Sequence, residues 1–332
     1  MKTFVRLITG FVLAFILIAP AYAEVNEIRI TKQPGLVYLP LTIMETNHLL
    51  EKQAKARGLG DIKVTWTVFT SGATAVDALL SGNVDLVTSG GTNMLVAWSA
   101  SNGRVKGVAG AGAIPMLLVT RNPNVKTIRD FTAADKIAVP SLKVSVQATI
   151  LRMAVAKEFG DSEVGRLDNF TVAMGHPDAY IALASGKGDL DSHFSLPPYW
   201  EEELKIPGVH TVLNSLDVAG GPVSNGVVFG TTEFHDANPK LMAAFLAAQT
   251  EAIDLIHNNK RLAAQIYLQD SHEKWSVDEI VAMLNDPNFV YSVAPRQSMK
   301  LHDSMFKSGI IKKPATSWKD YFFSEVHNLP GT

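Results

Sequence analysis

The sequence predicts an α/β protein built as two similar lobes. Apolar runs of strand length alternate with helical patterns along most of the chain, and a 17-residue segment recurs later in the sequence. Each copy of that segment ends in a turn that directly follows a strand. Alternating strands and helices are typical of βαβ units, so we expect largely parallel sheets with helices on both faces.

The first part of this alternation lies before residue 112. A strand is expected at 27–33, and the loop that follows leads into a helix ending near Gly58. The next elements follow in order: a strand at 62–69, a turn and helix at 70–82, a strand with a Gly-Gly turn at 83–91, a helix around 94–103 and a strand at 105–111. Glycines at such turns let the backbone approach a ligand closely.

The pattern restarts after residues 114–123. Residues 135–160 predict a strand, a polar turn and a long helix, and residues 170–195 predict strand, turn, helix and strand again. The chain then passes through 220–230 and becomes mostly helical. Asn238 before Pro239 is typical of a helix N-cap with proline at the first helical position, and Ser276 with Glu279 has the spacing of a capping box.

The internal repeat indicates that the two lobes are alike. Residues 75–91 (AVDALLSGNVDLVTSGG) align without gaps on residues 179–195 (AYIALASGKGDLDSHFS), with seven of 17 positions identical. In this alignment His193 and Phe194 correspond to Ser89 and Gly90. Ligands of open α/β sheets bind outside the carboxyl ends of the strands, so two such edges facing each other would form a cleft.

The N-terminal segment and the composition place the protein outside the cytoplasm. Residues 1–23 combine Lys2 and Arg6, an apolar run and Ala21-Tyr22-Ala23, which predicts a signal peptide cleaved after Ala23. The chain has no cysteine, and 30 basic residues stand against 32 acidic ones, a formal net charge of −2. A disulfide framework is thereby excluded, and a basic field for nucleic acid is absent.

Motifs for catalysis or metal binding are missing. The sequence has no Gly-x-Ser-x-Gly nucleophile elbow and no His-x-x-x-His pair. We therefore expect no catalytic residues, no metal and no cofactor. The alternatives left open are a lyase or isomerase on the same fold, with His176 or His193 as base, and a ligand-sensing protein.

Residues 71–110 carry a family resemblance that continues through 117–131, 178–195 and 308–323. The segment SGATAVDALLSGNVDLVTSGGTNMLVAWSASNGRVKGVAG resembles the solute-binding proteins of ABC importers in the nitrate, sulfonate and taurine group, which are related to binders of thiamine precursors. The resemblance implies a type II periplasmic binding protein, whose two lobes are joined by two crossing strands and close on a small molecule. We expect a first lobe of 24–118 and 222–332 and a second lobe of 119–221.

Four helix starts at the lobe edges are the candidate ligand contacts. A helix N-terminus presents unpaired N–H groups and a partial positive charge, which favour an anion. Lys143 would add a full positive charge, and Asn225 in the returning crossover could line the cleft floor. The expected ligand-binding residues are Gln33, Gly35, Leu36, Tyr38, Ser71, Gly72, Thr74, Ser89, Gly90, Gly91, Thr92, Asn93, Ser141, Lys143, Ser145, Gln147, His176, His193, Phe194 and Asn225.

Together these features predict a monomeric periplasmic binding protein that delivers its ligand to a permease and ATPase of an ABC importer. Such a protein docks on a membrane protein without inserting. Because Tyr38, His193 and Phe194 suggest an organic body next to the anion-binding helix starts, the expected ligand is a small organic anion, such as a sulfonate or taurine. A thiamine-pyrimidine precursor or an aromatic carboxylate is the alternative ligand.

Overall fold

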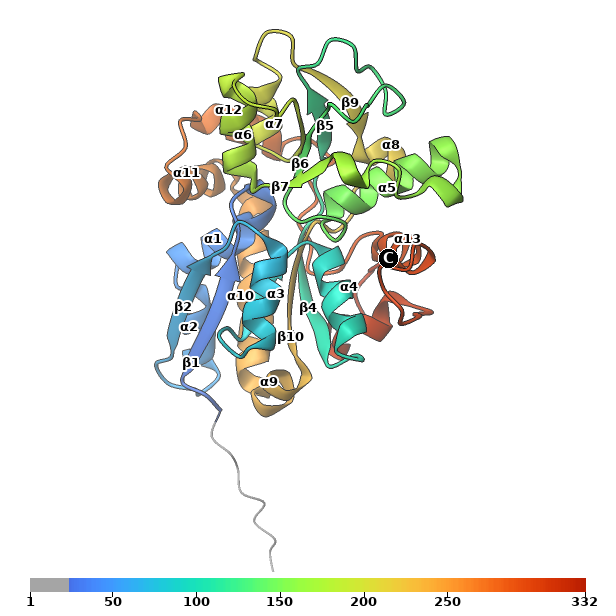
Figure 1. The fold of residues 1–332 in the computed structure, drawn as a ribbon. Coiled ribbons are helices and arrows are strands. Elements are labelled where there is room, and N and C mark those ends of the chain that lie inside the picture. Colours follow the sequence, from blue (N-terminus) through green and yellow to red (C-terminus); the bar gives the residue numbers. More distant parts are fainter. Residues whose placement is uncertain (1–23) are drawn as a thin grey trace, which may run out of the picture.

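The computed structural model describes residues 24–332, and in it two five-stranded sheets form the centres of two lobes (Figure 1). The signal peptide expected at 1–23 lies outside the described residues. Within 24–332, helices that combine the length and the apolar character needed to cross a membrane are absent.

The first sheet has the strand order β2-β1-β3-β10-β4. Strand β1 pairs in parallel with β2 and β3, whereas β10 runs antiparallel to β3 and β4. Its strands are β1 (Glu27–Lys32), β2 (Lys63–Val68), β3 (Leu86–Ser89), β4 (Val105–Gly112) and β10 (Gly226–Thr231). Its helices are α1 (Leu39–Thr46), α2 (Leu49–Ala56), α3 (Gly72–Leu80), α4 (Gly91–Ala100) and α10 (Pro239–Asn258).

The second sheet has the order β7-β6-β8-β5-β9. Strand β6 is parallel to β7 and β8, and β5 is antiparallel to β8 and β9. Its strands are β5 (Leu117–Thr120), β6 (Ile137–Val139), β7 (Thr171–Ala173), β8 (Ser192–Ser195) and β9 (His210–Asn214). Its helices are α5 (Val146–Phe159), α6 (His176–Ser185), α7 (Tyr199–Glu203) and α8 (Ser215–Ala219).

The two sheets share one topology, as the internal repeat predicts. Strands β3 and β8 are both central, with a parallel neighbour on one side and an antiparallel neighbour on the other. The gapless alignment misses one detail, because β3 ends at Ser89 whereas β8 ends at Ser195. His193 therefore lies two residues before the end of its strand rather than at the sheet edge.

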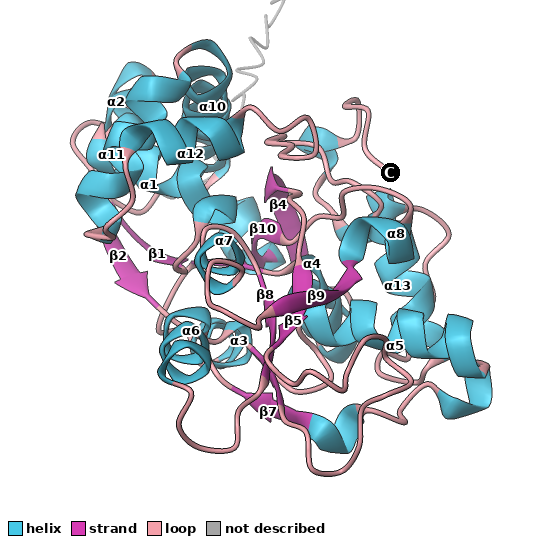
Figure 2. Cartoon of the chain, turned by 90° about the horizontal axis from the view of Figure 1, so that it is seen from above, coloured by secondary structure: helices cyan, strands magenta, loops and turns pink. Residues whose placement is uncertain are grey.

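The chain crosses between the sheets twice, from β4 to β5 and from α8 to β10. Asn225 ties the two crossings together: its side-chain amide donates to Ile114 O at 2.9 Å, and its Oδ1 accepts from Ile114 N at 3.1 Å. The returning chain then forms α9 (Thr232–Ala237), α10, α11 (Lys260–Ser271), α12 (Val277–Leu284) and α13 (Ser298–Lys307). Figure 2 shows α1, α2, α10, α11 and α12 on one side of the sheets and α5, α8 and α13 on the other.

Helix ends largely follow the sequence signals. Helix α10 begins at Pro239 as predicted, but Asn238 does not cap it, because Asn238 Oδ1 accepts instead from Val25 N at 2.9 Å. The carboxylate of Glu24 accepts from Lys240 N and Leu241 N, and so provides the cap. The predicted capping box of Ser276 and Glu279 is confirmed at the start of α12.

Replacing Ser276 with alanine should lower the free energy of unfolding by about 1 kcal/mol, because the hydroxyl accepts from Glu279 N at 3.2 Å. Urea denaturation followed by circular dichroism measures this difference. Ser162→Ala is the control, since Ser162 is exposed and makes no side-chain hydrogen bond in the described structure; it should change stability by less than about 0.5 kcal/mol. Equal stability of the two variants would contradict a stabilising cap.

Candidate functional site: two cavities between the lobes

A small polar cavity of about 20 Å³ lies where the edges of the two sheets meet. Ten of the 13 residues that line it are among those expected from the sequence: Gln33, Tyr38, Gly72, Ser89, Gly90, Asn93, Ser145, Gln147, His176 and Asn225. The other three are Pro140, Val146 and Leu196. A cavity of this size holds about one water molecule. The expected residues therefore gather around a space too small for an organic anion.

Hydrogen bonds among these side chains fill the lobe-one half of the small cavity. Gln33 Nε2 and Asn93 Nδ2 both donate to Ser89 Oγ, at 3.1 and 3.0 Å. The Tyr38 hydroxyl donates to Gln33 Oε1 at 3.3 Å. This network fixes the side chains around the Gly-Gly turn at Gly90 and Gly91.

The two lobe edges touch across the cleft. Ser71 Oγ on the first lobe lies 3.2 Å from Ser141 Oγ on the second. A Cβ added at Gly90 would lie only 2.8 Å from Val146 Cγ2, which begins helix α5. The missing side chain at Gly90 therefore lets helix α4 approach helix α5, and the described arrangement is a closed one.

A disulfide should form between the lobes in the double variant Ser71→Cys/Ser141→Cys, because the two hydroxyl oxygens are within hydrogen-bond distance. The chain contains no other cysteine, so mild oxidation should remove both free thiols, measured by thiol titration and non-reducing electrophoresis. The single variants Ser71→Cys and Ser141→Cys are the controls and should keep their thiols.

Gly90→Ala in this double-cysteine background should slow the crosslinking, because the new methyl group would press on Val146. Adding Val146→Ala should restore the rate by removing the opposing methyl groups. Crosslinking that ignores both changes would mean that the lobes do not meet at this contact.

A buried chain of three ionisable side chains leads to the small cavity. Glu203 Oε1 lies 2.6 Å from His193 Nδ1, and His193 Nε2 lies 2.8 Å from His176 Nδ1. His176 Nε2 in turn lies 3.1 Å from Gln147 Nε2, an arrangement in which the amide donates to the ring nitrogen. Glu203 and His193 are completely buried, and Tyr199 stacks on the His176 ring.

Burial dominates the electrostatics of this chain. Removal from water, together with the neighbouring His193, holds the pKa of His176 well below its usual value. His176 therefore stays neutral in the folded protein at a pH where the unfolded chain is already protonated. Neither nitrogen of the His193 ring is free, because Glu203 and His176 occupy both.

Stability should fall on acidification below about pH 6.5, because unfolding then lets His176 take up a proton; one such group contributes up to about 1.4 kcal/mol per pH unit. Thermal unfolding between pH 7 and pH 5 measures this slope. His176→Asn should flatten it, whereas His48→Asn, at an exposed position, should leave it unchanged. An unchanged slope in His176→Asn would show that His176 titrates normally in the fold.

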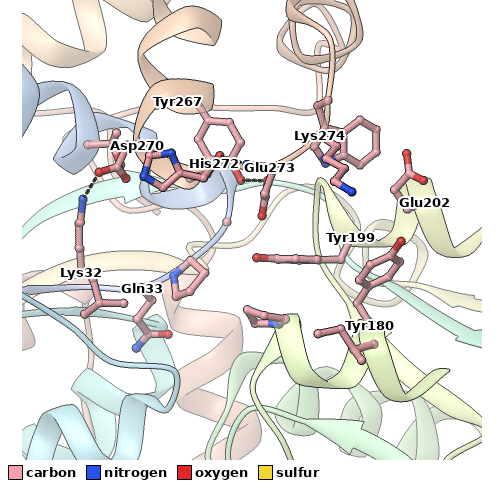
Figure 3. A pocket seen from close by; sticks show the side chains of 18 residues that line it. Lys32, Gln33, Tyr180, Tyr199, Glu202, Tyr267, Asp270, His272, Glu273 and Lys274 are labelled. Atoms are coloured by element: carbon pink, nitrogen blue, oxygen red, sulfur yellow. Dashed lines mark hydrogen bonds and ion pairs between the residues drawn. The ribbon is translucent and has the colours of Figure 1, made fainter. Parts of the chain in front are cut away.

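A large cavity of about 860 Å³ adjoins the small one through Gln33 and is lined from both lobes (Figure 3). The first lobe supplies residues of the loop after β1, and the second lobe supplies residues of α6 and α7. The end of α11 and the loop that follows it supply the rest. The lining residues are Lys32, Gln33, Pro34, Gly35, Thr42, Val68, Pro177, Tyr180, Ile181, Tyr199, Glu202, Tyr267, Asp270, Ser271, His272, Glu273, Lys274 and Trp275.

The charges of the large cavity are mostly paired. Lys32 Nζ lies 2.8 Å from Asp270 Oδ1 and also contacts Glu45. Glu202 pairs with Lys205 at 2.7 Å. Burial raises the pKa of Glu273, although Tyr267 Oη donates to this carboxylate at 2.9 Å and partly offsets the effect.

The remaining sequence-predicted residues lie outside the small cavity. Gly35 lines the large cavity, Lys143 and Thr74 are exposed, and Phe194 belongs to the hydrophobic core. The residues that line neither cavity are Leu36, Ser71, Thr74, Gly91, Thr92, Ser141, Lys143, His193 and Phe194. Their expected part in ligand binding stays a prediction.

Sequence reasoning missed the C-terminal contribution to the large cavity. Residues 267–275 (YLQDSHEKW) come after the chain has left the second lobe, and their helical pattern gave no sign of a cleft. The only local signal is a helix end at which acidic, basic and aromatic residues are crowded together. Groups of three or more His, Asp or Glu placed to hold a metal are absent from residues 24–332.

Comparisons with known proteins support the fold. No protein-family model and no curated protein sequence matches the chain. Among solved structures, the alkanesulfonate-binding protein SsuA from Xanthomonas axonopodis pv. citri, bound to MOPS, has a TM-score of 0.67 at 18% identity, covering 88% of this chain and 96% of its own. The aliphatic sulphonate binding protein SsuA from Escherichia coli has a TM-score of 0.63 at 18% identity, covering 91% and 93%.

The nitrate-binding protein NrtA from Synechocystis PCC 6803 is similar at a TM-score of 0.67 and 15% identity, covering 90% of this chain and 84% of its own. At such identities the likeness concerns the fold. The two lobes, each with a mixed five-stranded sheet, agree with it. The chain has the periplasmic binding protein fold that the sequence resemblance implies.

Proposed function

We propose that this protein is the periplasmic solute-binding component of an ABC importer and holds its solute in the large cavity. The observation that carries the proposal is a cavity of about 860 Å³ lined by both lobes of a periplasmic binding protein fold. Ligand sites of small organic molecules have volumes of about 300–1,000 Å³. The similar solved structures named as sulfonate- and nitrate-binding proteins support the same role.

Closure of the lobes would couple binding to delivery. A solute that touches Gln33 or Gly35 on the first lobe and Tyr180 or Tyr199 on the second gains its full set of contacts only when the lobes are together. Differential contacts of this kind favour the closed state. A membrane permease with its ATPase would then recognise the closed form.

A sulfonate-like anion is the ligand class that the helix N-termini favour. Helices α3, α4, α5 and α6 begin near the small cavity, at Gly72, Gly91, Val146 and His176. Their partial positive charges favour an anion by about 0.3–1 kcal/mol per helix. Because the small cavity holds about one water molecule, a sulfonate group would bind there only with the lobes further apart.

A binding role fits the histidines better than a lyase or isomerase does. A general base needs a free ring nitrogen within reach of the substrate. His193 is completely buried, with both nitrogens engaged, and His176 Nε2 faces Gln147. These contacts suit a structural part in the second lobe.

A cognate solute present at 100 times its Kd should raise the free energy of unfolding by about 2.7 kcal/mol. Thermal shift against a panel of organic sulfonates, carboxylates, aminopyrimidines, aromatic amines and inorganic oxyanions should therefore identify the ligand class. Hits are then tested for stimulation of ATP hydrolysis by the cognate permease and ATPase in vesicles. Chemical turnover of a hit without tight retention would contradict the transport role.

Two tryptophan variants test the place of binding. Ile181 is 63% exposed and lines the large cavity, so Ile181→Trp should reduce its volume and weaken binding at least tenfold. Leu204→Trp is the matched control, because Leu204 is exposed but outside both linings. Equal affinity in both variants would place the solute elsewhere.

A further inference from the structure

The large cavity contains one carboxylate that lacks a cationic partner. Glu273 follows α11 and is partly buried, and it forms no ion pair with a lysine, arginine or histidine of residues 24–332. Its Oε2 accepts from the Tyr267 hydroxyl at 2.9 Å. Figure 3 shows its carboxyl group between the rings of Tyr267 and Tyr199.

The other carboxylates of this cavity differ from Glu273 in being paired. Asp270 has Lys32 at 2.8 Å, and Glu202 has Lys205 at 2.7 Å. Lys274, next in sequence to Glu273, is exposed, so its ammonium group is hydrated rather than held against the carboxylate. Glu273 is therefore the position where a positive charge from outside the protein would compensate a desolvated negative one.

Flat aromatic surfaces surround this carboxylate. Tyr199 and Tyr180 project from the second lobe with ring centroids 6.3 Å apart, and Tyr267 and Trp275 come from the C-terminal segment. Lys205 Nζ lies 4.8 Å from the Trp275 ring centroid, so this ring already contacts one cation. Aromatic faces attract cations and stack on planar groups, and both effects are strengthened by exclusion of water.

We infer that the solute is an organic cation, a protonated amine or amidine attached to a flat ring, with its charged nitrogen on Glu273. This inference rests on the proposed function and names the solute class for the large cavity. The ring would stack on Tyr199 or Tyr180, and the nitrogen would donate to the carboxylate oxygen that Tyr267 leaves open.

Burial supports this assignment from a second direction. The pKa of Glu273 is raised because the ionised carboxylate is partly withdrawn from water without a cation to compensate it. A bound ammonium group would reverse that cost and form a charge-assisted hydrogen bond. A sulfonate in the same position would instead face the carboxylate charge.

Matched probes that differ in charge test the inference on the full mature protein. Benzylamine and benzamidine are the cations, benzyl alcohol is the neutral isostere, and benzoate and benzenesulfonate are the anions. Titration calorimetry and the fluorescence of Trp275 measure binding. We expect the cations to bind at least tenfold more tightly than the neutral and anionic probes, and tighter binding of benzenesulfonate would overturn the inference.

Glu273→Gln assigns the effect to one side chain. It should weaken benzamidine at least tenfold while changing benzyl alcohol less than twofold, because only the charge is removed. Glu163→Gln, an exposed position outside both linings, should change neither. Since the charge ranking of the probes is measured on the unmodified protein, it decides the question even if Glu273→Gln folds poorly.

The same panel separates the inference from the proposed function. Binding by anions alone would overturn the organic cation and keep the solute-binding role. No stabilisation by any compound of the wider thermal-shift panel would count against both. Cation binding that Glu273→Gln leaves unchanged would overturn the position assigned to the charged nitrogen.

Discussion

The contact between the two lobe edges is the constraint on which the space for a solute depends. Gly90 carries no side chain, and Val146 occupies the room that a Cβ would need. With Ser71 beside Ser141, this contact holds the edges together on one side of the cleft. The space between the lobes is therefore reduced to one water-sized cavity at the helix starts and a large cavity beside α11.

The buried chain of Glu203, His193 and His176 connects this contact with the wall of the large cavity. Glu203 anchors His193 in β8, and His193 orients the His176 ring, which reaches the small cavity. The same ring stacks on Tyr199, which lines the large cavity. Because buried polar groups without partners are costly, this chain keeps one geometry, and it holds Tyr199 in position for a solute.

The sequence predicts the fold well, because alternating strands and helices and an internal repeat are local signals. It also predicts which helix starts face the cleft, since the carboxyl ends of neighbouring strands share an edge. It does not predict that these edges close on one another, which depends on the shape of Gly90 and Val146 together. It misses Tyr267 and Glu273, because their place in the cavity follows from how α11 packs after the chain has returned from the second lobe.

The sign of the solute's charge then depends on which electrostatic effect is larger in the closed arrangement. A helix N-terminus favours an anion by about 0.3–1 kcal/mol, but the closed edges leave space there for about one water molecule. A hydrogen bond to a charged group contributes about 1.5–3 kcal/mol, and Glu273 offers one inside the large cavity. A solute of this cavity therefore meets an uncompensated carboxylate before it meets a helix N-terminus, and a positive charge gains more than a negative one.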